Sequence, residues 1–110
     1  MKIPFQKTEL HDKGAFKAHF YVGKKDRPDF NALLVDCVTD HYKTKLNGAA
    51  RVYFVIEGSG TFTINEKTES AERYDLFIIV DGDTYAYEGS MKLFEFNVPA
   101  TDGSNEEKMN

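Results

Sequence analysis

Arg51, Tyr53, Tyr85 and Tyr87 are the side chains of this sequence best suited to hold a ligand. The two members of each pair are two residues apart in segments with strand character, so they point to the same face of their strand. A guanidinium offers a fork for carboxylate or phosphate, and a phenol offers a stacking surface and a hydroxyl. The pattern predicts a pocket for a small anion or a sugar-like compound, with Tyr85 as a candidate acid–base group.

The same residues also allow an interpretation without a ligand. Arg51 could pair with Glu95 or Asp83 and so fill the interior of the fold. Tyrosines on strands commonly pack in the core or at its rim, with the hydroxyl finding a nearby partner. Both interpretations stay open at the level of the sequence.

Glu95 and His41 are the other candidate catalytic residues. Glu95 and Asn97 alternate with Phe94 and Phe96, so one of these pairs must face inward. We expect the phenylalanines to face the core, because a buried carboxylate is costly unless it is paired. The opposite orientation would make Glu95 a pocket acid or base. His41 could reach the same pocket, although an exposed position at a strand end is the simpler expectation.

Short segments of alternating apolar and polar residues must position these side chains. Turn residues separate the segments, and helical periodicity is almost absent, which predicts an all-β sandwich or barrel. An apolar run over residues 76–80 is typical of a strand that is covered on both sides. Residues 43–49 are expected to form a loop. The expected strands are residues 16–22, one or two within 31–42, then 51–57, 61–64, 76–80, 84–87 and 92–98.

The whole chain has 110 residues, enough for a single domain, which we place at residues 1–100, with 101–110 as a flexible tail. Its net charge of −4, without a basic run, argues against nucleic acid as a partner. No segment is apolar over the length of a membrane span. A single cysteine, Cys37, allows no internal disulfide, so a cytoplasmic location is expected.

Residues 51–60 and 74–89 resemble the two signature segments of the cupin superfamily. Gly58 and Gly82 stand at glycines of the two motifs, with the strand pattern expected around them. The resemblance implies a cupin double-stranded β-helix, a jelly-roll-like barrel that usually holds a metal ion. Arg51 stands at the slot of the metal-binding glutamate, and Tyr85 at the slot of a histidine.

The two remaining histidine slots of the cupin motif fall on Lys45 and Asn47, or on Thr44 and Leu46 with the longer spacing. Transition metals prefer imidazole and carboxylate ligands, whereas a guanidinium has no lone pair to donate. The resemblance therefore implies a cupin without the usual metal and without another cofactor. It adds Lys45 and Asn47 to the predicted ligand-binding residues.

Three functions remain open on this basis. The first is a metal-independent cupin that binds a small anion or a sugar-like compound. The second is a metal-free isomerase or epimerase that uses Tyr85 in acid–base catalysis, with His41 or Glu95 as its partner. The third is a structural or regulatory dimerisation module with a filled barrel. A homodimer is expected in each case, through the apolar alternation of residues 16–22 at a sheet edge.

Overall fold

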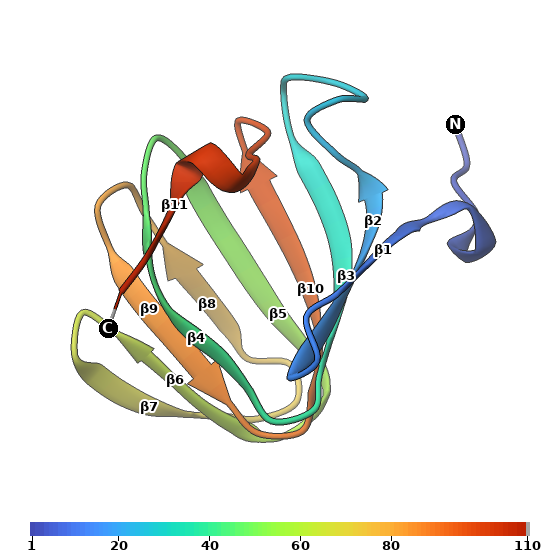
Figure 1. Cartoon of the computed structure of the whole chain (residues 1–110). Coiled ribbons are helices and arrows are strands. Elements are labelled where there is room, and N and C mark those ends of the chain that lie inside the picture. Colours follow the sequence, from blue (N-terminus) through green and yellow to red (C-terminus); the bar gives the residue numbers. More distant parts are fainter. Residues whose placement is uncertain (110) are drawn as a thin grey trace.

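The computed structural model describes residues 1–109, which form two antiparallel β-sheets curving around a shared interior (Figure 1). One sheet has six strands in the order β1-β2-β3-β10-β5-β8, and the other has five in the order β11-β4-β9-β6-β7. No helix in this part of the chain is long and apolar enough to cross a membrane. The strands are β1 (Glu9–Asp12), β2 (Phe16–Val22), β3 (Asn31–Cys37), β4 (Asp40–Leu46), β5 (Ala50–Gly58), β6 (Gly60–Ile64), β7 (Lys67–Ala71), β8 (Leu76–Ile79), β9 (Thr84–Glu88), β10 (Met91–Val98) and β11 (Glu106–Lys108).

The core lies between the two sheets and follows from strict alternation along the strands. In β3, β5 and β10, every second side chain is buried, while the side chains between them face outward. Aliphatic and aromatic side chains fill the end of the interior away from the polar cluster described below. The largest fully buried side chains of the whole core are Tyr53, Tyr85, Phe62, Leu46, Ile79 and Leu93, of which Tyr85 reaches the polar cluster. The all-β barrel that the alternation predicts is confirmed.

Three elements differ from the sequence-based expectation. The region 43–49, expected to be a loop, continues β4 as far as Leu46. β1 and β7 were not expected, because the four residues of β1 and the first four of β7 are exposed and show no apolar alternation. Both are edge strands, paired through backbone hydrogen bonds with β2 and β6 respectively. Polar strands of this kind carry no hydrophobic signal.

The segment after Thr101, expected to be a flexible tail, is folded against the barrel as far as it is described. A short 3₁₀ turn, η2 (Gly103–Asn105), follows a capping box in which Asp102 accepts from the backbone of the turn. β11 then pairs with β4, placing Glu106 opposite Leu46. Asn110 lies outside the described residues.

Two further expectations about edges need correction. The segment 16–22 is β2, which lies between β1 and β3 and therefore has no free edge for pairing with another chain. The apolar run 76–80 contains β8, which is an edge strand covered on one side only. Its outward residues Leu76 and Ile78 are 55% and 56% exposed.

Gly58 shows why the motif needs a glycine at the end of β5. Its φ is +86°, a conformation that side chains other than glycine rarely adopt. A Cβ at this position would lie 2.2 Å from the backbone oxygen of Ser90. This close approach lets β5 turn into β6 beside the start of β10.

Candidate ligand-binding site

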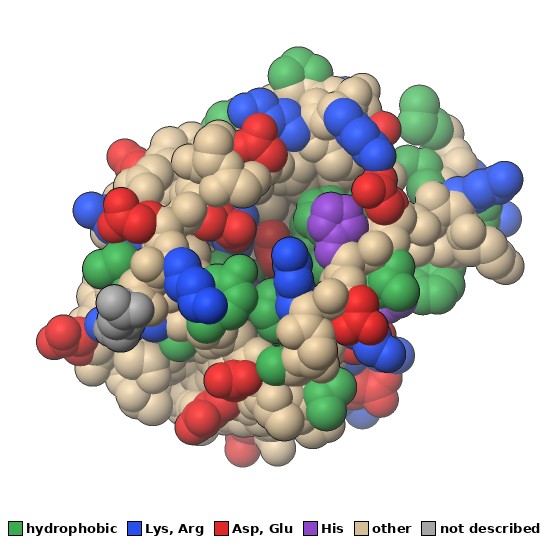
Figure 2. Space-filling view, viewed as in Figure 1, with side chains coloured by type: hydrophobic (Ala, Val, Ile, Leu, Met, Phe, Trp, Pro, Cys, Tyr) green, Lys and Arg blue, Asp and Glu red, His purple; other side chains and the backbone are tan. Residues whose placement is uncertain are grey.

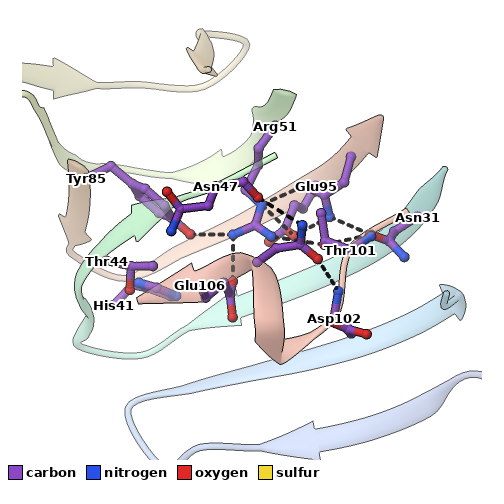
Figure 3. A network of polar contacts seen from close by, with 12 residues as sticks. Asn31, His41, Thr44, Asn47, Arg51, Tyr85, Glu95, Thr101, Asp102 and Glu106 are labelled. Atoms are coloured by element: carbon purple, nitrogen blue, oxygen red, sulfur yellow. Dashed lines mark hydrogen bonds and ion pairs between the residues drawn. The ribbon is translucent and has the colours of Figure 1, made fainter. Parts of the chain in front are cut away.

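Arg51 is the centre of a polar network at one end of the barrel (Figure 3). Its side chain projects inward from β5 and is almost fully buried. Nε donates to Asn97 Oδ1 at 2.5 Å, and one terminal nitrogen donates both to Tyr85 Oη and to Glu106 Oε1 at 2.7 Å. The other terminal nitrogen donates to Thr101 Oγ1 at 3.2 Å. One guanidinium thereby joins β5, β9, β10 and the C-terminal segment.

Two carboxylates flank this guanidinium. Glu95 Oε2 lies 3.3 Å from Arg51 Nε and also accepts a hydrogen bond from Asn97 Nδ2 at 2.9 Å. Glu106 forms the second ion pair, and its side chain is more exposed than that of Glu95. Burial alone would lower the pKa of Arg51, but the negative charges of Glu95 and Glu106 outweigh it and raise that pKa. The cation is therefore permanent.

Asn31 anchors the C-terminal segment to the network. Its Oδ1 accepts from Thr101 N at 2.7 Å, from Thr101 Oγ1 at 2.9 Å and from Asn97 Nδ2 at 3.0 Å. In residues 1–109, its buried Nδ2 has no hydrogen-bond partner. The first residue of β3 thus fixes the point at which the chain turns from β10 toward η2.

The three inward tyrosines lie beneath this network. Tyr53 Oη and Tyr85 Oη are 3.1 Å apart, whereas the buried hydroxyl of Tyr87 finds no partner in the described chain. Burial raises the pKa of each of the three phenols. They stay protonated at neutral pH, and Tyr85 acts as a support for Arg51.

His41 lies at the start of β4, inside an aromatic cage. Its ring stacks on Tyr87, Tyr85 and Tyr42 at centroid distances of 4.9, 5.3 and 4.6 Å, and it is 6% exposed. Nδ1 lies 2.8 Å from the backbone oxygen of Tyr42. A carbonyl can only accept, so Nδ1 carries the proton and a neutral ring presents a lone pair at Nε2. Burial lowers the pKa of His41, which favours this neutral form.

A β-bulge brings both His41 and Thr44 to the inner face of β4. His41 pairs with Tyr87 and Thr44 with Tyr85, so β4 has two residues where β9 has one. His41 and Thr44 are three residues apart and would face opposite sides of a regular strand. The extra residue of the bulge turns both side chains inward, and both are buried. Counting alternate residues from the sequence could not reveal this.

An open cavity of about 1580 Å³ adjoins the network. Figure 2 shows it as a hollow with acidic, basic and histidine side chains around it. Its polar wall is formed by His41, Arg51, Glu95, Asn97, Thr101 and Glu106. Its apolar wall comes from β2 and β3 and is formed by Phe16, Ala18, Phe20, Leu33 and Val35. The barrel interior is thus filled at one end and open at the other.

Exposed ion pairs connect neighbouring segments at the rim of the cavity. Lys24 Nζ lies 3.5 Å from Asp102 Oδ2, which connects the loop after β2 to the C-terminal segment. Lys25 pairs with Glu9 of β1. Together these pairs hold the loop after β2 against two neighbouring segments at the entrance.

The structure brings some of the sequence-predicted site residues together and places others elsewhere. Arg51, Glu95 and His41 meet at the polar wall, while the three tyrosines lie below it. Lys45 alternates with the buried Thr44 and Leu46 and therefore points away from the interior. This agrees with the longer motif spacing and corrects the placement of Lys45 in the pocket. Asn47 lies just after β4, held through its backbone by Asn105.

The expected orientation of β10 is wrong. Glu95 and Asn97 face inward, whereas Phe94 and Phe96 face outward. The cost of burying Glu95 is offset by Arg51, a partner that no local pattern could identify. Pairing of Arg51 with Glu95 agrees with the ligand-free interpretation, whereas Asp83 instead bonds Asn65 and a backbone amide.

Sequence reasoning missed three members of the network: Asn31, Thr101 and Glu106. Asn31 gives no signal, because a single asparagine before an apolar run resembles an ordinary turn residue. Thr101 and Glu106 belong to a polar, acidic segment whose composition resembles a mobile terminus. Only the buried charge of Arg51 explains why an acidic residue returns to the barrel.

The metal ion that the cupin resemblance implies does not fit these residues. The first-motif slots hold Thr44, Leu46 and the cation Arg51, and the second-motif slot holds the protonated Tyr85. Glu95 and Glu106 already share the charge of Arg51. In residues 1–109, no three His, Cys, Asp or Glu side chains are grouped as metal ligands. A divalent ion would meet a fixed positive charge at this place.

Comparisons with known proteins identify solved structures with the same fold. No family model and no curated protein matches the chain. The solved structure of Pac13, described as a nucleoside dehydratase, matches 100% of this chain and 91% of its own with a TM-score of 0.91 and 21% identity. Structures of Streptomyces PAC13 variants with uridine, at 20% identity, match equally well; each variant has a single histidine or tyrosine substituted.

Two further structures extend the comparison. KdgF from Halomonas sp. matches with a TM-score of 0.80 and 10% identity, over 93% of this chain and 96% of its own. A variant of oxalate decarboxylase from Bacillus subtilis matches with a TM-score of 0.79 and 14% identity, over 96% of this chain and 31% of its own. At these identities the likeness concerns the fold.

Proposed function

Because this chain has the cupin fold of Pac13, KdgF and oxalate decarboxylase, we propose that it binds a small molecule at the open end of the barrel, without a metal ion. The ligand is a neutral, hydroxyl-rich compound with a flat apolar part, and nucleosides are the first class to test. This proposal narrows the sequence-based expectation, which allowed a small anion equally.

The observation that carries the proposal is the set of hydrogen bonds that Arg51 makes within the protein. Four of its hydrogen bonds go to the protein itself, so its fork is not free to take a carboxylate or phosphate. The second oxygens of Glu95 and Glu106 receive no hydrogen bond from the described chain. Both residues line the cavity. Two carboxylates around one guanidinium leave this wall with a net negative charge and free acceptor oxygens, which favours hydroxyl donors over an anion.

The opposite wall supports the flat part of the ligand. Phe16, Phe20 and Val35 line the cavity on the side of β2 and β3. Such a surface gains from covering an apolar or aromatic ring, while the polar wall orients the hydroxyl groups. Uridine, present with the PAC13 variants, combines a flat base with a sugar and is therefore the natural first probe.

The test compares uridine with orotate, a flat pyrimidine that carries a carboxylate and no hydroxyls. Amide chemical shifts in NMR spectra should move near Glu95, Glu106 and His41 on adding uridine and not on adding orotate. Glu106→Gln should weaken uridine binding by about tenfold, the worth of one hydrogen bond to a charged group. Glu69→Gln, on the far edge strand β7, is the matched control and should bind normally. Tighter binding of orotate than of uridine would refute the proposal.

A second candidate function, a metal-free acid–base enzyme, is favoured by His41. Burial lowers the pKa of His41, so its Nε2 is unprotonated at neutral pH and free to act as a general base, and its ring lines the cavity. Tyr85, the earlier candidate, is buried behind the network and bonded to Arg51. The reaction would be the loss of water: His41 takes a proton from the carbon beside a carbonyl, a carbon–carbon double bond forms, and the hydroxyl one carbon further takes that proton back from the imidazolium and leaves as water.

A test for chemical turnover distinguishes this second function from simple binding. Sugar derivatives with a carbonyl, incubated in deuterated water, should exchange a carbon-bound proton or lose water, as followed by NMR. His41→Gln should abolish both reactions while leaving the amide shifts caused by uridine in place. Binding without exchange in the unaltered protein would leave the binding function and exclude the enzyme for those substrates.

A further inference from the structure

The outer face of the six-stranded sheet carries an apolar surface across four neighbouring strands. Register places its side chains in rows that run across β3, β10, β5 and β8. We call this surface the outer apolar face. Its first row is Leu34, Phe94, Phe54 and Leu76, and its second row is Ala32, Phe96, Val52 and Ile78. Val80 and Val98 continue it at one end, each 49% exposed.

This composition is abnormal for a solvated sheet face. An antiparallel sheet that faces water usually alternates apolar residues toward the core with polar residues toward solvent. Here both rows are apolar on every strand, and β8 has apolar residues on both sides. The sequence of β8 is that of a strand covered on both faces, whereas the single chain covers only one.

Within residues 1–109, the rows are covered only at their borders, where Phe30 stacks on Phe96 and Tyr74 on Phe54 at centroid distances of 5.4 and 6.1 Å. Leu76 and Ile78 stay more than half exposed. The N-terminal Phe5 packs elsewhere, on His19 and Tyr21 of β2, with centroids 5.0 and 6.4 Å away. Four strands about 4.8 Å apart and four same-face rows about 6.8 Å apart, counting the Lys92–Glu57 row and the Val98 row, give roughly 500 Å² of flat area. The relief of large side chains brings the accessible area toward the ~800 Å² per partner of a standard interface.

Charges at the border of the face point to the occupant. Lys92 of β10 and Glu57 of β5 are paired in register at one end of the rows, and their side chains form an ion pair of 3.3 Å. A two-fold axis that runs along the strands between β10 and β5 would place Lys92 over Glu57 of a second copy, and Glu57 over its Lys92. The four charges would then alternate around a square, which a self-complementary interface requires.

We propose that the outer apolar face is the surface through which two copies of this chain associate, with β10 of one copy over β5 of the other. The same axis places Phe94 against Phe54 and the β3 residues of one copy against β8 of the other. This arrangement covers Leu76 and Ile78, the most exposed residues of the two rows. It replaces the expectation of pairing through residues 16–22, which have no free edge.

Sedimentation velocity over a wide range of concentrations tests the proposal. The unaltered chain should sediment as a dimer, and Phe94→Glu should weaken association by about a hundredfold or more, because it places a charge at the centre of the interface. Val38→Glu is the control, since Val38 is an exposed apolar residue outside the face, in the turn between β3 and β4. A monomer at all concentrations, or a dimer unchanged by Phe94→Glu, would overturn the proposal.

Exchanging the charges at the border tests how the two copies are oriented. It alters only surface residues, whose substitution the fold tolerates. Lys92→Glu alone and Glu57→Lys alone should each dissociate more readily, because like charges then meet across the axis. An equal mixture of the two variants should form heterodimers of near-normal stability, since each contact between copies then joins opposite charges. If each variant associates as well as the unaltered chain, or the mixture gains nothing, the proposed arrangement is refuted. Circular dichroism checks that each variant is folded.

Discussion

The two faces of β10 reverse the usual division between inside and outside. At the open end of the barrel, Glu95 and Asn97 face the interior while Phe94 and Phe96 face outward. Toward the closed end, Leu93 faces the core and Lys92 faces outward in the ordinary way. The strand therefore changes character along its length, and its polar inner part is where Arg51 supplies compensation.

This contrast shows that burial of polar groups depends on partners rather than on residue type. A buried carboxylate is costly alone, but Glu95 forms an ion pair with Arg51 and accepts a hydrogen bond from Asn97. At the closed end the interior is aromatic, with Phe62 stacked on Phe77 at 4.2 Å. The following predictions alter one region or the other.

The largest effect is expected for Arg51→Met. It removes the cation from between Glu95 and Glu106 and leaves an uncompensated buried carboxylate, which costs about 3–5 kcal/mol of unfolding free energy. Chemical denaturation measures this loss. The double variant Arg51→Met with Glu95→Gln should recover part of it, because the buried charge is also gone. A single variant as stable as the unaltered protein would show that the network is not a stabilising unit.

Neighbouring residues of β10 should respond differently to truncation. Leu93→Ala opens a cavity in the core and should cost about 2–5 kcal/mol at any protein concentration. Phe94→Ala should cost less at low concentration and show a larger loss at high concentration, where the dimer proposed above adds stability. Denaturant midpoints at several concentrations separate the two. Equal behaviour of both variants would contradict the different roles given to the two faces.

Two tyrosines offer a smaller and more selective comparison. Tyr85→Phe removes the hydroxyl that accepts from Arg51 and should cost about 1–3 kcal/mol, because a buried N–H loses its partner. Tyr87→Phe should be neutral or slightly stabilising, since its hydroxyl is buried without a partner in the described chain. The ranking is read from chemical denaturation. A larger loss in Tyr87→Phe would mean that its hydroxyl has a partner, such as a buried water.

The smallest expected effect concerns pH and His41. Its pKa in the folded state lies below the unfolded value near 6.5 because burial disfavours the imidazolium. Unfolding therefore takes up a proton in this window, so stability is full above about pH 6.5 and falls as the pH decreases toward the folded pKa. The slope cannot exceed about 1.4 kcal/mol per pH unit for one group. The pH dependence of denaturation should lose this component in His41→Gln, and an unchanged profile would contradict it.

The sequence predicts the strands and much of their facing correctly. Arg51 and Tyr53 share a face, as do Tyr85 and Tyr87, because strand alternation is local. Alternation cannot tell which face is inward when the inner residues are polar, and that is why the inward face of β10 was predicted wrongly. The decisive partner, Arg51, lies on another strand far away in the sequence.

The remaining differences have equally local causes. The bulge in β4 changes parity between His41 and Thr44, and nothing in the residues 42–43 announces it. Glu106 sits in a segment with the composition of a tail, yet it is drawn back to the barrel by charge. The inward direction of β4 around the bulge and the place of Glu106 in the site could be found only from three-dimensional contacts. The fold is therefore easier to predict from this sequence than the site.

The ion pairs at the cavity entrance respond to salt differently from those at its floor. Mobile ions screen exposed charges within about 8 Å at physiological ionic strength, but they do not reach a guanidinium that is 2% exposed. Raising the salt concentration therefore loosens Lys24 from Asp102 while the charges around Arg51 stay as they are. Ionic strength acts on entry to the cavity and leaves the recognition surface inside unchanged.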